Sequence, residues 1–282
     1  MTIRFENVCY HYNSKLPQNS RVLKQITFKI SDGEFIGIIG PSGSGKTTLL
    51  QHFTGLLRPT SGKIYFDEQD IWSKNYPLNV IRKEIGLVFQ FPETQLFEET
   101  VYADVAFGPR ALQLSDNEVE MRVTEALKLV GMTDEKIQTR SPHQLSEGEK
   151  RRVAIAGVLA MAPKMLILDE PTACLDPAGV KLVIQILKHL HKIGTTIIMI
   201  THNMDVITEL AQRIILLYQG EIFYDGFKNT LFMNEKLLQK VDLETPRIIR
   251  LCELLYKLNI LTHKNIYTVN DLKREIKNFA DS

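Results

Sequence analysis

The sequence predicts an α/β fold built on a mostly parallel sheet, and three observations lead to this prediction. The chain has 282 residues, of which 44% are apolar and 24% charged, an ordinary composition for a protein with a sizeable core. Stretches whose apolar residues recur about every 3.6 positions, as in a helix, separate several short apolar runs. These runs have the length and composition of strands buried on both faces of a parallel sheet; they are Phe35–Ile39, Ile85–Gln90, Met165–Leu168, Thr196–Ile200 and Ile214–Tyr218.

The chain is expected to open with antiparallel β structure. Polar and apolar residues alternate in Thr2–Val8 and again in Arg21–Ile30, as they do in strands with one buried face. A loop that contains Pro17 and Asn19 joins the two segments. We therefore expect the two segments to pair as antiparallel neighbours.

Helices are predicted between the buried strands and after them. The helical spacing covers Lys46–Leu56, Pro177–Ile193 and Asn203–Arg213. Between Phe91 and Gln144 the pattern changes to polar helices, notably Asp116–Val130. We predict one main domain over residues 1–226 with a helical insertion at about residues 91–150. Residues 227–282 are expected to form a small C-terminal helical extension, with helices over Lys228–Val241, Pro246–Leu258 and Val269–Phe279.

Charge and composition exclude several classes of protein. Lys+Arg 34 and Asp+Glu 33 leave a formal net charge of +1, so no overall positive field attracts nucleic acid or an anionic membrane. Residues 1–20 lack the apolar core of a signal peptide, and apolar runs such as Ile197–Ile200 are far shorter than the roughly 18 residues that span a bilayer. The three cysteines, Cys9, Cys174 and Cys252, lack CxxC spacing, which argues against a disulfide framework or a zinc site. A reducing cytoplasm is therefore the expected location.

A glycine-rich loop is the strongest local signal of function. The segment Gly40-Pro41-Ser42-Gly43-Ser44-Gly45-Lys46-Thr47 satisfies the pattern GxxxxGK[ST], follows a predicted strand and opens a predicted helix. Its glycines let backbone amides surround phosphate oxygens, and the helix N-terminus adds a partial positive charge. Lys46 is expected to contact the β- and γ-phosphates and Thr47 to bind Mg²⁺, while Thr48 continues the same cofactor-binding segment. The loop predicts a nucleoside triphosphate site.

Two carboxylates follow the buried strand Met165–Leu168. In open α/β sheets, ligands bind at the carboxyl ends of the strands, where Asp169 and Glu170 are expected to lie. Asp169 suits the coordination of Mg²⁺, and Glu170 suits a general base that polarises the attacking water. The two carboxylates therefore predict that the bound triphosphate is hydrolysed.

A further segment, Leu145-Ser146-Glu147-Gly148-Glu149, lies shortly before the carboxylate strand. Together with the preceding motifs and with Gln90, Leu175-Asp176-Pro177 and His202, which stand in the family's order, it resembles the signature of the ABC ATPase family. The resemblance covers Thr2 to about Gly226. It implies a RecA-like core with an N-terminal antiparallel β-subdomain and an inserted α-helical subdomain. It also implies that two such domains enclose two ATP molecules between them.

The resemblance assigns the signature residues to the ATP that the partner domain holds. Ser146, Gly148 and Glu149 would bind that nucleotide at a helix N-terminus, and Asp176 would lie where the two domains meet. The usual pattern is Leu-Ser-Gly-Gly-Gln, so Glu147 and Glu149 bring acidic groups close to a polyanion. Glu149 also has a local explanation, because Ser146-x-x-Glu149 forms a capping box. The sequence leaves capping and a functional effect equally open.

Three other site residues follow from the resemblance. Gln90 would link Mg²⁺ and the attacking water to the helical insertion, and His202 would contact the γ-phosphate. Tyr12 matches the aromatic residue that stacks on adenine, with Tyr10 as a competitor. Asp176-Pro177 also has the pattern of a helix start, which is compatible with its place at the domain interface.

One subgroup of the ABC ATPase family resembles this sequence best. The segment from Phe89 to Val101, continued by Asp104–Pro109, is similar to the ATP-binding subunits of energy-coupling factor transporters, which include cobalt and nickel uptake ATPases. The resemblance implies a second, related ATPase subunit as partner. It also implies a transmembrane coupling protein and a small membrane protein that binds a vitamin or a transition metal ion. The chain would lie peripherally on the cytoplasmic face of the cell membrane, and nucleic acid is not expected as a partner.

The sequence has three alternative interpretations. A homodimer, as in simpler metal-uptake systems, is the runner-up. A soluble ABC ATPase of DNA repair or translation is disfavoured, because the sequence has one phosphate loop, no heptad run and no basic patch. A non-hydrolysing structural subunit would lack Lys46 or Glu170, and both are present.

Overall fold

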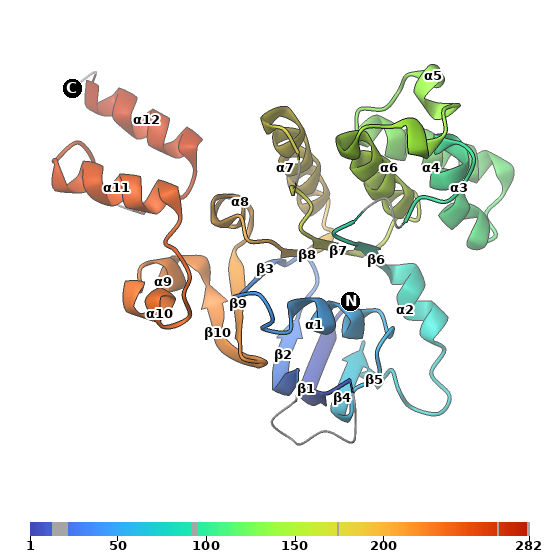
Figure 1. Ribbon diagram of the computed structural model, residues 1–282, viewed down its shortest axis with the longest axis horizontal. Coiled ribbons are helices and arrows are strands. Elements are labelled where there is room, and N and C mark those ends of the chain that lie inside the picture. Colours follow the sequence, from blue (N-terminus) through green and yellow to red (C-terminus); the bar gives the residue numbers. More distant parts are fainter. Residues whose placement is uncertain (13–21, 92–94, 174, 264, 281–282) are drawn as a thin grey trace.

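The computed structural model describes residues 1–12, 22–91, 95–173, 175–263 and 265–280 (Figure 1). Within these residues the strands form two sheets, in the orders β2-β1-β4-β5 and β10-β9-β3-β8-β7-β6. The first sheet is antiparallel, and the second is parallel apart from its edge pair β9–β10. The strands are β1 (Ile3–Tyr10), β2 (Leu23–Ile30), β3 (Phe35–Ile39), β4 (Ser61–Phe66), β5 (Gln69–Asp70), β6 (Ile85–Val88), β7 (Met165–Asp169), β8 (Thr196–Ile200), β9 (Arg213–Tyr218) and β10 (Glu221–Phe227).

The predicted α/β class is therefore confirmed, and so is the antiparallel pairing of the first two strands. The helices are α1 (Lys46–Phe53), α2 (Leu78–Glu84), α3 (Val101–Ala111), α4 (Asp116–Leu129), α5 (Glu135–Gln138), the 3-10 turn η3 (Pro142–Gln144), α6 (Glu147–Leu159), α7 (Pro177–Lys192), α8 (Met204–Leu210), α9 (Lys228–Phe232), α10 (Glu235–Lys240), α11 (Arg247–Lys257) and α12 (Val269–Ala280). None of the helices in the described part of the chain is long and apolar enough to cross a bilayer.

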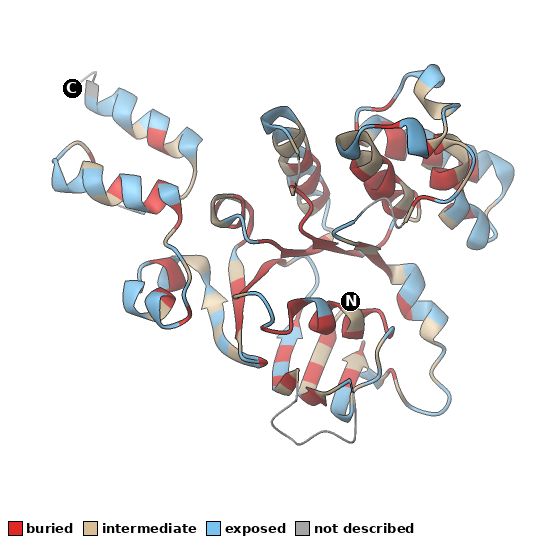
Figure 2. Cartoon of the chain, viewed as in Figure 1, coloured by how far each residue is buried: buried red, intermediate tan, exposed pale blue. Residues whose placement is uncertain are grey.

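The six-stranded sheet separates two apolar cores. Alternate residues of a strand point to opposite faces, so Phe35 and Ile39 of β3 join one core while Ile36 and Ile38 join the other. In Figure 1, α6, α7 and α8 lie on one face of this sheet, and α1 and the antiparallel sheet lie on the other. The central strands are buried along their whole length, as Figure 2 shows. The carboxyl ends of β3, β7 and β8, which are neighbours in the sheet, therefore meet at one edge.

Several predicted boundaries were wrong. The helix expected over Asn203–Arg213 ends at Leu210, because Arg213 already belongs to β9, where it pairs with Ile36 and donates to both carboxylate oxygens of Asp225 at 2.7 Å. The helix predicted from Lys228 to Val241 divides into α9 and α10, since Asn234 caps a new start. The strand from Ile85 ends at Val88 rather than Gln90.

Other elements were not predicted, namely α2, β4, β5 and β10. The residues of β10 alternate between exposed and half-buried, so this edge strand carries no buried apolar run. Some sequence expectations concern residues outside the described ranges, among them the loop residues Pro17 and Asn19, the thiol of Cys174 and residues 92–94. The thiols of Cys9 and Cys252 are buried.

Candidate functional site

The phosphate loop forms the turn between β3 and α1. Its backbone requires glycine, because Gly43 and Gly45 have φ values of 77° and 103°, in the left-handed region. At Gly40, a Cβ atom would collide with the carbonyl oxygen of Leu217. The Ser44 hydroxyl is buried there without a hydrogen-bond partner among the described residues. An orphaned polar group in a glycine-rich loop at a helix start fits an anionic ligand.

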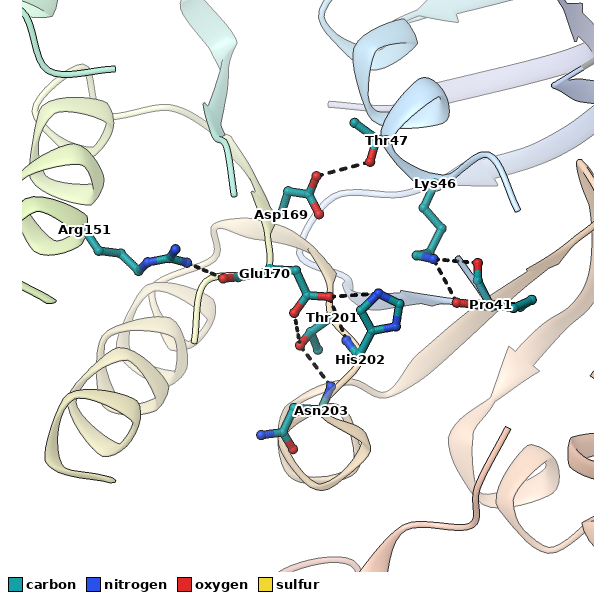
Figure 3. A network of polar contacts seen from close by, with 10 residues as sticks. Pro41, Lys46, Thr47, Arg151, Asp169, Glu170, Thr201, His202 and Asn203 are labelled. Carbon is teal, nitrogen blue, oxygen red and sulfur yellow. Dashed lines mark hydrogen bonds and ion pairs between the residues drawn. The ribbon is translucent and has the colours of Figure 1, made fainter. Parts of the chain in front are cut away.

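Lys46 lies folded back against this loop. Its Nζ donates to the carbonyl oxygens of Gly40 at 2.8 Å and of Pro41 at 2.9 Å (Figure 3). Burial lowers the pKa of Lys46, while the nearby carboxylates Glu170 and Asp169 act in the opposite direction. A buried cation so close to the loop is placed to neutralise phosphate charge.

Thr47 and Asp169 meet across the gap between α1 and the end of β7. The Thr47 hydroxyl donates to Oδ2 of Asp169 at 3.4 Å (Figure 3). Burial raises the pKa of Asp169, the adjacent Glu170 raises it further, and Thr47 and Lys46 lower it. A hydroxyl and a carboxylate are hard oxygen donors of the kind that Mg²⁺ prefers, so these two residues fit that ion.

Glu170 is held from several directions. Its φ of 51° is unusual for a residue other than glycine. Its Oε2 accepts from the Thr201 hydroxyl at 2.8 Å, and its Oε1 accepts from the backbone amide of His202 at 2.8 Å. Nε2 of His202 lies 3.5 Å from the same Oε1. The Glu170 carboxylate is thus buried and held at the carboxyl end of β8, beside the exposed imidazole of His202.

The backbone of Gln90 is linked to that of Glu170 through Arg151. It lies exposed just beyond β6, and its carbonyl oxygen accepts from Nη2 of Arg151 at 2.6 Å. The same guanidinium donates through Nη1 to the carbonyl oxygen of Glu170. Arg151 and Thr201 are site residues that the sequence analysis missed. A polar residue that directly follows a buried strand was the available signal for Thr201, whereas nothing in the local pattern marks Arg151.

The signature segment starts α6, and Ser146 is its N-cap. The Ser146 hydroxyl and backbone amide both donate to Oε2 of Glu149, at 2.8 and 2.9 Å, and the Glu149 amide lies 3.4 Å from the hydroxyl. The capping box considered for Glu149 is therefore present. These bonds lower the pKa of Glu149, with the backbone amide as the largest cause. Glu147 instead pairs with Lys150 at 2.9 Å.

Ser146, Gly148 and Glu149 line a surface cavity of about 590 Å³ together with Asp176. Asp176 caps α7, accepting from the amide of Gly179 at 2.8 Å, so the predicted helix start is confirmed. None of the described residues that line this cavity comes from the phosphate loop. The structure therefore gathers the site residues into two separate groups: the phosphate loop with Asp169, Glu170 and His202, and the signature with Asp176.

The two tyrosines near the phosphate loop differ in environment. Tyr12 is 66% exposed, and its hydroxyl lies 3.0 Å from Oγ1 of Thr48. Tyr10 is half-buried and packs edge-on against Tyr12 and His52, with ring centroids 5.1 and 4.9 Å apart. An exposed ring beside the phosphate loop is free to stack on a base, which favours Tyr12 over Tyr10.

Comparison with known proteins identifies the family of this chain. A family model described as ABC transporter matches residues 23–173, more than half of the chain. The chain belongs to the ABC transporter family. A solved cassette described as dimeric, in a post-hydrolysis state bound to ADP and phosphate, is similar at 32% identity and a TM-score of 0.69, over 80% of this chain and 98% of that one. The protein is an ATPase coupled to transport.

Within that family, the similar proteins are energy-coupling factor transporter ATP-binding proteins. EcfA2 of Caldanaerobacter subterraneus subsp. tengcongensis is 47% identical over 98% of this chain and 96% of its own length. EcfA of Methanocaldococcus jannaschii is 43% identical over 94% of each chain. The solved structure of cbiO1 from Clostridium perfringens, part of the ABC transporter complex cbiONQ, is 40% identical with a TM-score of 0.74, over 89% of this chain and 98% of that one.

Proposed function

We propose that this chain is one ATPase subunit of an energy-coupling factor transporter that powers uptake of a vitamin or a transition metal ion. One observation carries the chemistry: the neighbouring strands β3, β7 and β8 deliver the phosphate loop, Asp169 with Glu170, and Thr201 with His202 to the same edge of the sheet. That edge is where open α/β sheets bind ligands. The similarity to energy-coupling factor ATPases supplies the kind of transport.

In this proposal, each residue at the edge has its own role in hydrolysis. The loop and Lys46 bind the β- and γ-phosphates of ATP, and Tyr12 stacks on the adenine. Thr47 and Asp169, with Gln90, would hold Mg²⁺, which neutralises phosphate charge when bound. Glu170 accepts a proton from the attacking water, and His202 donates a hydrogen bond to the γ-phosphate.

The site is completed by a second subunit. Because Ser146, Gly148, Glu149 and Asp176 line a cavity apart from the phosphate loop, one chain provides two unlike halves of a site. A head-to-tail pair brings the halves together around two ATP molecules, so ATP itself joins the subunits. A related ATPase is the partner we favour, since the acidic signature suits one member of an unequal pair. A homodimer is the alternative.

A groove on the helical insertion suits the membrane partner. Gln95, Leu96, Phe97, Phe107 and Met161 are among the residues that line a cavity of about 240 Å³ between α3 and α6. The rings of Phe97 and Phe107 meet edge-on at 4.8 Å and are 60% and 48% exposed. Such an apolar groove fits a helix of the transmembrane coupling protein, and we propose that the chain binds it on the cytoplasmic face of the membrane.

The exchange Glu170→Gln in the assembled transporter tests this function. The amide cannot accept the proton, so we expect turnover to fall by about 100-fold or more while ATP affinity changes by less than about twofold. Uptake into vesicles should fall with hydrolysis. Glu120→Gln, at an exposed position on α4, is the matched control and should leave both unchanged. Full turnover in the Glu170→Gln complex would remove Glu170 from its role.

A further inference from the structure

Arg151 occupies an unusual position for a buried cation. Its side chain comes from α6, the helix that starts at the signature serine, and it is only 4% exposed. Burial of a guanidinium is costly unless its donors are satisfied. Here they meet two backbone carbonyls, those of Gln90 and Glu170, from segments 61 and 19 residues away in the sequence.

The two carbonyls belong to neighbouring strand ends. Strands β6 and β7 pair in parallel register, with Val88 opposite Leu168, and Gln90 and Glu170 each follow two residues later. Both segments leave the sheet there, so no strand pairing fixes their separation beyond this point. A planar guanidinium with donors in a fixed fork can set the distance and angle between two acceptors, which a point charge cannot.

The contact also bears on the backbone of Glu170. That residue has a positive φ, a conformation disfavoured for a side chain with a Cβ. Its amide donates to the Ile200 carbonyl at 2.8 Å, and its carbonyl accepts from the Ala173 amide at 3.1 Å as well as from Arg151. Figure 3 shows Arg151 reaching the carbonyl side of Glu170 while Thr201 and His202 hold the carboxylate. Of these partners, Arg151 alone comes from α6.

We propose that Arg151 is a positioning residue that sets the geometry of the general base and of the glutamine loop according to the position of α6. The inference rests on the proposed roles of Glu170 and Gln90. When α6 contacts the ATP of the partner subunit, the guanidinium of Arg151 holds the segments of Glu170 and Gln90 in the positions that hydrolysis requires. When α6 moves away, the same contact draws Glu170 and Gln90 out of alignment.

The test uses Arg151→Lys in the full transporter complex. Lysine keeps the charge but loses the fork, so we expect kcat to fall by about 10- to 100-fold, the loss typical of a small misplacement, with ATP affinity changed by less than about twofold. Arg82→Lys, at an exposed position on α2, is the matched control and should behave as the unsubstituted complex does.

A double substitution separates positioning from a structural effect. If Arg151 acts through Glu170, Arg151→Lys should slow single-turnover hydrolysis by less than about twofold in the Glu170→Gln background, since the group it positions is already disabled. Losses that multiply, or a kcat of Arg151→Lys equal to that of the Arg82→Lys control, would overturn the proposal.

The folding of the Arg151 variants and the proposed role of Glu170 are tested separately. Arg151→Gln keeps an amide donor and serves as a second variant, and thermal melting shows whether each variant folds. Loss of folding in both would also overturn the proposal, because Arg151 would then be a structural residue. Failure of Glu170→Gln alone to lower turnover would instead contradict the proposed function.

Discussion

Glu149 has a local structural role and a proposed place in the shared ATP site. Its carboxylate accepts from the amide and the hydroxyl of Ser146, so the hydroxyl proton that a phosphate could receive is already engaged. The same carboxylate lies in the cavity formed by the signature and Asp176. The two interpretations that the sequence left open are therefore compatible, and a substitution can separate them.

The exchange Glu149→Gln removes the charge and keeps the cap. Glutamine at this position also completes a capping box, so the melting temperature should change by less than about 2 °C. Removing one negative charge near the partner's ATP should raise the ATPase activity of the complex by about fivefold, as about 1 kcal/mol of repulsion is relieved. Glu149→Ala is the comparison, because it removes charge and cap together. Unchanged activity in Glu149→Gln would leave capping as the residue's only role.

The pKa of Glu149 fixes how these effects depend on pH. Because Ser146 lowers that pKa in the folded state, the stability from the cap is present above the ordinary glutamate value and is lost as the pH falls through the folded value. Glu149 therefore stays ionised at neutral pH. The gain in activity of Glu149→Gln should be constant from about pH 6.5 to 8. A gain that disappears toward the acid end of this range would show that Glu149 titrates there.

At the scale of elements, the strands with continuous apolar runs were predictable and the others were not. A strand buried on both faces, such as β3 or β8, is apolar at almost every position, with Thr196 at the start of β8 as an exception. Strands β4 and β10 lack that constraint, since β4 begins with exposed residues and the residues of β10 alternate between exposed and half-buried. Their pairing depends on neighbours that local sequence does not reveal.

The residues of the candidate site also divide into those that the sequence predicts and those that it does not. The phosphate loop, the carboxylate pair and the histidine could be predicted because each is a short segment whose chemistry requires particular residues. Arg151 could not, because its function depends on two carbonyls that the fold brings together from distant segments. Thr201 could be marked only as a polar residue after a buried strand, since its contact with Glu170 depends on the pairing of β7 with β8.

Helix α11 has exposed apolar residues that suit a contact with another subunit. Ile248, Ile249 and Cys252 face the core, while Leu254 and Leu258 belong to a second apolar stripe and are 57% and 67% exposed. We expect this stripe to extend the contact between the two ATPases. Leu254→Asp should therefore weaken pairing of the purified subunits by about tenfold, as the burial of one leucine is lost. Lys273→Asp, at an exposed position on α12, is the control. Equal pairing of both variants would contradict this role.

For the whole molecule, the proposed function depends on assembly with other proteins. The chain provides two unlike half-sites, an exposed apolar groove on the helical insertion and an exposed stripe on α11. In the proposed function, each of these features binds a second protein. We therefore propose that the chain works as the ATPase subunit of a membrane complex, joined through the groove around Phe107.

Purification of the tagged chain from its native membranes in mild detergent, followed by mass spectrometry, tests this claim most directly. We predict that a second ATPase, a transmembrane coupling protein and small membrane proteins co-purify in fixed proportion. The exchange Phe107→Asp should release the membrane proteins and keep the ATPase pair, because it places a charge in the apolar groove. Recovery of the chain alone, or with ribosomes or nucleic acid, would contradict the transport function and leave only the ATPase chemistry.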